Sequence, residues 1–142
     1  MTNECNRDNM ELFVEALFSS SYEQGKGSLR TEHPDLPDKY QYCCLGVATE
    51  VAIKAGIPEE TKVDEYGDPY VDNVWENGYL PSSVREWLGI DSDNPLLDFL
   101  HGNTLRAASA NDEYEQSFFQ IGAAFRRTYL TSDIRSAEVA GD

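Results

Sequence analysis

Helical hydrophobic periodicity between residues 44 and 55 constrains the fold more than any other feature of the chain. Small and apolar side chains recur there at helical spacing for three turns, at Cys44, Val47, Ala48, Val51, Ala52 and Ala55. Gly56 is well suited to the position just past a helix, and Pro58 follows where a helix has stopped. We therefore predict a central helix whose small side chains let another element pack closely against it.

The same period predicts helices in three other segments. The first follows Asn9, which we expect to be its N-cap, and runs to about residue 18. A short helix spans residues 81–88 and ends at Gly89, and the last follows Ser117 as N-cap and runs to about residue 129. Short strands are expected at residues 62–65 and 70–75, around a turn. The pattern predicts a helix-rich α+β domain with a small antiparallel sheet or hairpin.

The length of 142 residues fits a single domain. An apolar fraction of 40% with 11% aromatics excludes a wholly disordered acidic chain. We expect a flexible N-terminus over residues 1–8, a globular domain over 9–131 and a flexible acidic tail over 132–142. Because no apolar run approaches about 18 residues and the polar N-terminus lacks signal-peptide features, we expect a cytoplasmic protein without membrane contact.

The chain is strongly acidic, with 26 acidic and 11 basic side chains and a net charge of −15. This balance argues against direct binding of nucleic acid, which needs lysine and arginine for phosphate contacts. Residues 59–98 hold eleven acidic and two basic side chains, a net charge of −9. Carboxylates on a rigid surface can imitate phosphates and occupy a basic nucleic-acid-binding groove, whereas the same charge can serve solubility alone. The candidates for partner binding are Asp64, Glu65, Asp68, Tyr70, Asp72, Trp75 and Glu76.

The paired cysteines at the start of the predicted central helix are candidates for thiol chemistry. A helix N-terminus favours a thiolate, so Cys44 could act as a nucleophile, with His101 as base and Asn111 as orienting residue. The alternative function is then a cysteine-dependent hydrolase or transferase. The helical period equally predicts that Cys44 is a buried core residue.

Lys26 and Arg30 form a locally basic stretch around Gly25 and Gly27. Backbone N–H groups of such a turn can hold a small anion, so a third hypothesis is a sponge for an anionic nucleotide signal. A plain turn is the competing interpretation, since no Walker or Rossmann pattern follows. No cofactor is predicted. No metal site is predicted either, because the cysteines lack C-x₂-C spacing and residues 64–68 lack the spacing of a calcium loop.

Several blocks of the sequence resemble small proteins encoded by tailed bacteriophages. The most specific block is YCCLGV at residues 42–47, and others are LPSSVREWLG at 80–89 and an Asn-Asp pair at 111–112 followed by SFFQIG at 117–122. The chain departs from that pattern at Ala110, where a leucine is usual, and residues 111–117 are one residue longer. The resemblance implies a phage origin but no agreed chemistry. It favours a binding protein over an enzyme, one that engages and inhibits a host protein in the infected cell, including a protein of host defence.

Overall fold

The computed structural model describes residues 5–57, 61–63, 65–67, 69–71, 75 and 78–130, with the backbone alone for 61–63, 69–71 and 101. The expected small α+β domain is confirmed. The described helices are α1 Arg7–Phe18, α2 Cys44–Lys54, α3 Ser82–Leu88, α4 Ala107–Asp112, α5 Phe118–Tyr129 and the 3-10 turn η2 Leu100–Gly102. The described strands are β1 Glu23–Gln24, β2 Arg30–Glu32, β3 Tyr40–Tyr42, β4 Thr61–Val63, β5 Pro69–Val71, β6 Leu96–Asp98 and β7 Thr104–Arg106.

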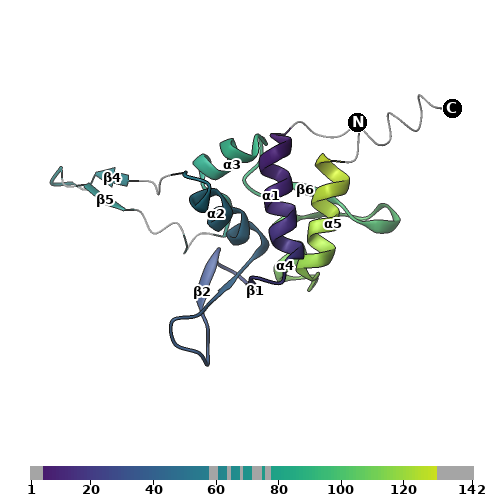
Figure 1. Cartoon of the computed structure of the whole chain (residues 1–142), viewed down its shortest axis with the longest axis horizontal. Coiled ribbons are helices and arrows are strands. Elements are labelled where there is room, and N and C mark those ends of the chain that lie inside the picture. Colours follow the sequence, from purple (N-terminus) through teal and green to yellow (C-terminus); the bar gives the residue numbers. More distant parts are fainter. Residues whose placement is uncertain are drawn as a thin grey trace.

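Helix α1 lies between α2 and α5 and packs against both (Figure 1). The strands form three small sheets around this layer. In the first, β3 pairs in parallel with β1 and antiparallel with β2. The antiparallel pair β6–β7 packs against α5, whereas the pair β4–β5 stands apart from the helices on the other side of α2 (Figure 1).

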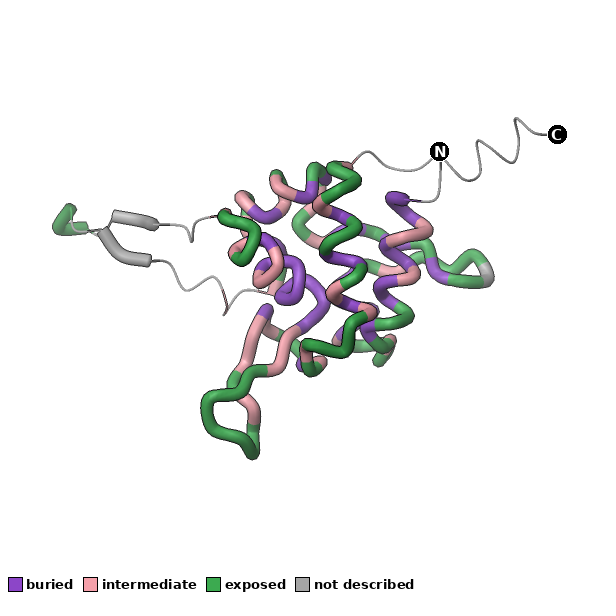
Figure 2. Tube along the Cα trace, viewed as in Figure 1, coloured by how far each residue is buried: buried purple, intermediate pink, exposed green. Residues whose placement is uncertain are grey.

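The core forms where the helices face one another, as the purple segments of Figure 2 show. Phe13 of α1 and Phe125 of α5 are fully buried, and their rings meet edge to face at 4.7 Å. The first six residues of α2, from Cys44 to Thr49, are all buried, so this helix is covered on every side near its start. None of the described helices combines the length and the apolar character that a membrane crossing needs.

The predicted helix ends are confirmed at three places and wrong at one. Gly56 directly follows Ala55, the C-cap of α2, and has a positive φ of 108°. Ser117 caps α5 in a reciprocal capping box with Gln120, and Gly89 ends α3 in the left-handed conformation at φ 73°. Asn9 is not the cap of α1. Its backbone N–H donates to the side chain of Asn6, which is the true N-cap, while the Asn9 amide reaches across to the carbonyl of Trp87 at 2.7 Å.

Helix α4 was not predicted, because its six residues are too few for a clear hydrophobic period. Asn111 and Asp112 are the last two residues of this helix. Two strands were expected at residues 62–65 and 70–75, and the structure has β4 and β5 there, paired antiparallel. Residues 64 and 72–74 of the expected strands lie outside the described residues.

A close crossing of two chain segments fixes the position of the first sheet. Leu29 is fully buried and crosses the first turn of α2, where the Cys43 N–H donates to its carbonyl oxygen at 3.2 Å. A Cβ atom added at Gly46 would collide with that carbonyl group. Position 46 therefore has no space for a side chain. Because this residue lies within a regular helix, glycine is required there for space and not for its backbone conformation.

Gly46→Ala is expected to destabilise the protein by about 3 kcal/mol, because Leu29 or α2 must move away and the packing around both is lost. The free energy of unfolding in urea measures this. Glu15→Ala, at an exposed position of α1, serves as the control and should change stability by less than about 0.5 kcal/mol. Equal stabilities of Gly46→Ala and wild type would contradict the crossing.

Candidate functional site

A buried amide joins three segments that are distant in the sequence. Asn111 is fully buried at the end of α4, and its Nδ2 donates to the carbonyl of Gly25 and to Oδ1 of Asp112, both at 2.8 Å. Its Oδ1 accepts from Nε2 of Gln24 at 2.8 Å, and the same Gln24 nitrogen also donates to the carbonyl of Gln116 at 2.7 Å. The amide of Asn111 thus holds residues 25–27, which we call the glycine turn, against α4.

The glycine turn that we considered for anion binding already holds a carboxylate of its own chain. The Gly27 N–H donates to Oδ1 of Asp112 at 3.1 Å, and the Gly25 N–H donates to the carbonyl of Tyr42 at 2.7 Å. Lys26 pairs at 3.2 Å with Glu115, which lines the shallow hollow beside the turn. An incoming anion would therefore meet the negative charges of Asp112 and Glu115, which disfavours this turn as an anion site.

Both cysteines at the start of α2 are buried in apolar surroundings. Cys43 is 2% exposed and Cys44 is fully buried, with its Sγ donating to the carbonyl of Ala107 at 3.5 Å. Burial raises the pKa of the Cys43 thiol to about 11 and raises the pKa of Cys44 well above its usual value. Both groups are neutral thiols at physiological pH, so neither supplies the thiolate that a nucleophile requires.

The other members of the thiol hypothesis are His101, of which the structure describes the backbone alone, and Asn111, whose amide has other partners. His101 belongs to η2, whose hairpin projects beyond α5, while α2 lies on the opposite side of α1 (Figure 1). Asn111 has its donors and its oxygen engaged in the network described above. The structure therefore offers no arrangement of base and orienting residue for this thiol among the side chains that it describes.

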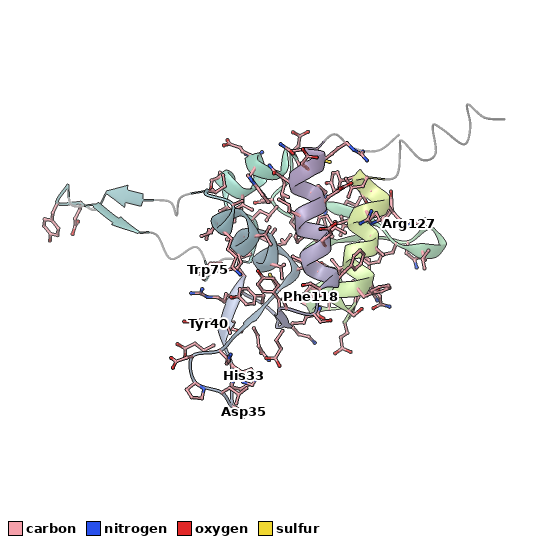
Figure 3. All side chains as sticks on the ribbon, viewed as in Figure 1. His33, Asp35, Tyr40, Trp75, Phe118 and Arg127 are labelled. Carbon is pink, nitrogen blue, oxygen red and sulfur yellow. The ribbon has the colours of Figure 1, made fainter. Side chains whose placement is uncertain are left out.

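A stack of a guanidinium between two aromatic rings forms the most distinctive exposed feature. The Cζ atom of Arg30, in β2, lies 4.0 Å from the ring centroid of Tyr40 and 4.2 Å from that of Trp75. Tyr40 is 41% exposed, whereas Arg30 and Trp75 are half-buried. Figure 3 shows Trp75 and Tyr40 one above the other beside β2. We call Arg30, Tyr40, Tyr42 and Trp75 the aromatic cluster.

The aromatic cluster continues toward Tyr22 as a chain of edge-to-face ring contacts. Tyr42 meets Trp75 at 6.2 Å and Tyr22 at 5.2 Å, and the Lys54 ammonium donates to the Tyr22 hydroxyl at 3.2 Å. Burial raises the pKa of Tyr42, and the Glu50 carboxylate nearby raises it further. Each ring thus braces the next, which holds Tyr40 and Trp75 in place.

Of the seven predicted partner-binding residues, the structure describes three and leaves four outside the described residues. Asp64, Asp68, Asp72 and Glu76 lie outside the described residues, and Tyr70 is described by its backbone in β5, opposite Lys62. Glu65 is exposed, in the turn between β4 and β5. Trp75 is a member of the aromatic cluster.

The two predicted anion-binding residues do not share a site. Lys26 pairs with Glu115, while Arg30 stacks with aromatic rings, so they belong to separate clusters.

Sequence reasoning missed Tyr40 and Tyr42, which belong to the aromatic cluster, and Tyr22, which adjoins it. A signal was available for two of them, because Tyr40 and Tyr42 alternate along a short extended segment and therefore share one face. The register places Arg30 directly opposite Tyr42, on that same face. Nothing in the sequence indicated that Trp75 would come from a distant segment to cover Arg30.

A second hollow, of about 340 Å³, lies between α5 and the β6–β7 hairpin. Its lining is mainly apolar, and the rim residues Leu100 and Phe119 are 64% and 69% exposed. Within the described part of the chain, no group of three histidine, cysteine or acidic side chains is arranged to hold a metal ion.

Asn111→Ala is expected to lower the free energy of unfolding by about 3 kcal/mol, because the Gly25 carbonyl and the Gln24 amide lose buried partners. Urea unfolding of wild type and variant measures the loss. The matched control is Asn103→Ala, at an exposed asparagine in the β6–β7 hairpin, which should change stability by less than about 0.5 kcal/mol. Similar losses in both variants would refute the importance of the network.

The buried Cys43 thiol is expected to make stability fall in alkaline solution. Its pKa of about 11 in the folded protein exceeds the unfolded value of about 8.5, so unfolding releases a proton between these pH values. The contribution is complete below pH 8.5 and is lost as pH rises toward 11, by about 3 kcal/mol in total. Cys43→Ala should flatten the curve of unfolding free energy against pH by this amount. Parallel curves for variant and wild type would contradict the assignment.

Comparison with known proteins identifies the family of the chain. A family model described as Domain of unknown function (DUF8296) matches residues 6–127, which include every element from α1 to most of α5. No curated protein and no solved structure matches the chain. The matched region contains the glycine turn, both buried thiols, the Asn111 network and the aromatic cluster. The chain belongs to the DUF8296 family.

Proposed function

We propose that this protein is a small acidic binding protein that engages and inhibits a host protein, with the aromatic cluster as the centre of its contact surface. The observation that carries the proposal is the half-exposed stack of Arg30 between Tyr40 and Trp75. Tyrosine, tryptophan and arginine are the residues on which binding energy at protein interfaces most often depends.

Rigidity of the cluster supports this role. Binding usually costs free energy because long side chains lose conformational freedom at the interface. The arginine is already confined between two rings, and Tyr42 supports Trp75 from the inner side. These side chains therefore lose less conformational entropy when a partner covers Tyr40, so the cluster is preorganised for binding.

Charge around the cluster supports a partner with a basic surface. Glu32 faces Tyr40 across the β2–β3 pair, and Asp35 and Asp38 lie exposed in the loop between these strands. Trp75 itself belongs to the stretch of residues 59–98 with its net charge of −9. A basic nucleic-acid-binding groove on the host protein would complement this charge and would be attracted to it over a distance. The resemblance to tailed-phage proteins suggests an infected cell as the setting.

The two alternative functions receive less support from the described residues. A cysteine-dependent hydrolase or transferase needs a reactive thiolate, and Cys44 is a fully buried thiol with a raised pKa. A sponge for an anionic nucleotide needs Lys26 and Arg30 in one site, and they belong to separate clusters. Recognition of a protein surface is the function that uses the exposed features of this fold.

Tyr40→Ala is expected to weaken capture of the host protein at least about tenfold, because an exposed anchor is removed while the core is unchanged. Tyr114→Ala is the matched control, since Tyr114 is 54% exposed and lies outside the cluster. Immobilised wild type and variants are incubated with host lysate at 50 and 300 mM salt, and captured proteins are quantified by mass spectrometry. We expect a protein retained by wild type and Tyr114→Ala, lost with Tyr40→Ala, and retained less at high salt.

The partner found in this way is then purified, and its affinity is measured by titration calorimetry. Trp75→Ala provides a second variant, with circular dichroism as a check that it folds. Equal affinities of wild type, Tyr40→Ala and Trp75→Ala for the partner would refute the proposed contact surface. Absence of any specifically retained protein at both salt concentrations would refute the binding function itself.

A further inference from the structure

His33 occupies a position in which each ring nitrogen has a hydrogen-bond partner. Its Nδ1 accepts from the backbone N–H groups of Asp35 and Leu36, both at 3.0 Å, and its Nε2 lies 2.9 Å from Oε2 of Glu23 in β1. The side chain is only 12% exposed. Because Nδ1 accepts two hydrogen bonds, it carries no proton, and the proton of the neutral ring lies on Nε2.

These bonds close the loop between β2 and β3. The His33 N–H donates to the carbonyl of Lys39 at 2.9 Å, which joins the two ends of the loop. Pro34 has no N–H, so the next two backbone donors are those of Asp35 and Leu36, and both point to the imidazole. Figure 3 shows His33 and Asp35 close together in this loop, with Tyr40 on the strand that follows it.

The pattern is the one that asparagine or aspartate forms when its side chain accepts from backbone N–H groups two and three residues ahead. Asparagine in this role keeps its acceptor at every pH. An imidazole does not, since it is the side chain that ordinarily gains a proton between pH 5 and 8. A proton on Nδ1 would face two N–H donors and would break both hydrogen bonds.

Glu23 acts in the opposite direction on the other nitrogen. Its carboxylate favours a positively charged ring, and Gln41 of β3 donates to the same oxygen at 3.3 Å and holds it in place. A protonated ring therefore keeps its contact with Glu23 and loses its contact with the loop. The remaining charged side chains of the loop and of strand β2 are the half-buried Arg30, which stacks on aromatic rings, and four exposed ones: Glu32, Asp35, Asp38 and Lys39.

The geometry points to a latch operated by a single proton: neutral His33 holds the β2–β3 loop closed against β1, and protonation at Nδ1 releases residues 34–39. A consequence rests on the proposed function. Tyr40 follows this loop directly, and its ring lies against Arg30. Release of the loop removes the support on one side of Tyr40 and weakens the proposed contact surface below neutral pH.

The latch is tested on the isolated protein by NMR at pH 8 and pH 5.5. Long-range nitrogen spectra should show the Nε2–H form of His33 at pH 8. The protection factors of the Asp35 and Leu36 amides against exchange should fall about tenfold on acidification, because two hydrogen bonds are lost together. Amides of α1 serve as an internal reference and should keep their protection.

Three variants separate the latch from other effects of acid. His33→Asn retains an acceptor without a titrating ring, so both amides should stay protected at both pH values. His33→Ala should leave them unprotected at both. His101→Gln removes the other histidine and should behave as wild type. Equal protection in wild type at pH 8 and 5.5, or the same loss in His33→Asn as in wild type, would overturn the latch.

The consequence for binding is measured separately, with the purified partner. Affinity of wild type should fall at least about threefold from pH 7.5 to 5.5, while that of His33→Asn should fall less, because its loop stays closed. Equal pH dependence of the two proteins would overturn the link between loop and contact surface. Failure to find any partner refutes the proposed function and leaves the NMR result on the latch as an independent test.

Discussion

The crossing of Leu29 over the first turn of α2 is the constraint on which the rest of the described structure depends. The absence of a side chain at Gly46 lets a backbone carbonyl come this close to a helix, and the Cys43 N–H binds it there. Once Leu29 is buried at this point, the residues on either side have little freedom. The glycine turn before it must lie over α4, and Arg30 after it must emerge beside Tyr42.

Two groups of residues that suggest chemistry in the sequence are explained by this crossing as structural. The thiols lie beneath the crossing, where burial raises their pKa values and keeps them neutral. The glycine turn has its N–H of Gly27 bound to Asp112, so a carboxylate from the same chain takes the place of an external anion. Both groups therefore have structural roles: the thiols are part of the core, and the Gly27–Asp112 hydrogen bond joins the glycine turn to the end of α4.

The proposed function therefore uses the exposed side chains of the first sheet. The aromatic cluster combines exposed ring surface with side chains that are already fixed, and Glu32 lies opposite Tyr40 at its edge. The loop between β2 and β3 is closed by an imidazole where asparagine would serve without titrating. Contact surface and latch thus share one short antiparallel pair, β2–β3, so that a local change of protonation acts on residues directly attached to the proposed binding centre.

Local sequence patterns predict those parts of the fold in which local chemistry agrees with packing. The periodicity of α2, the Ser117 cap of α5 and the Gly89 end of α3 are properties of a few neighbouring residues, so they could be predicted. The start of α1 was misplaced by three residues, because Asn6 and Asn9 are both good caps. The choice between them depends on Trp87, whose carbonyl binds the Asn9 amide from a distant helix.

The candidate site was decided by the tertiary structure. The sequence singled out Arg30 and Trp75, but for different sites, and nothing local indicates that they stack. Likewise Asn111 becomes a buried junction only when Gln24 and Gly25 arrive from 86 or 87 residues away in the chain. Hydrophobic period and capping report how a residue relates to its neighbours in the chain. Stacking and buried hydrogen bonds depend on which distant segments the core brings together.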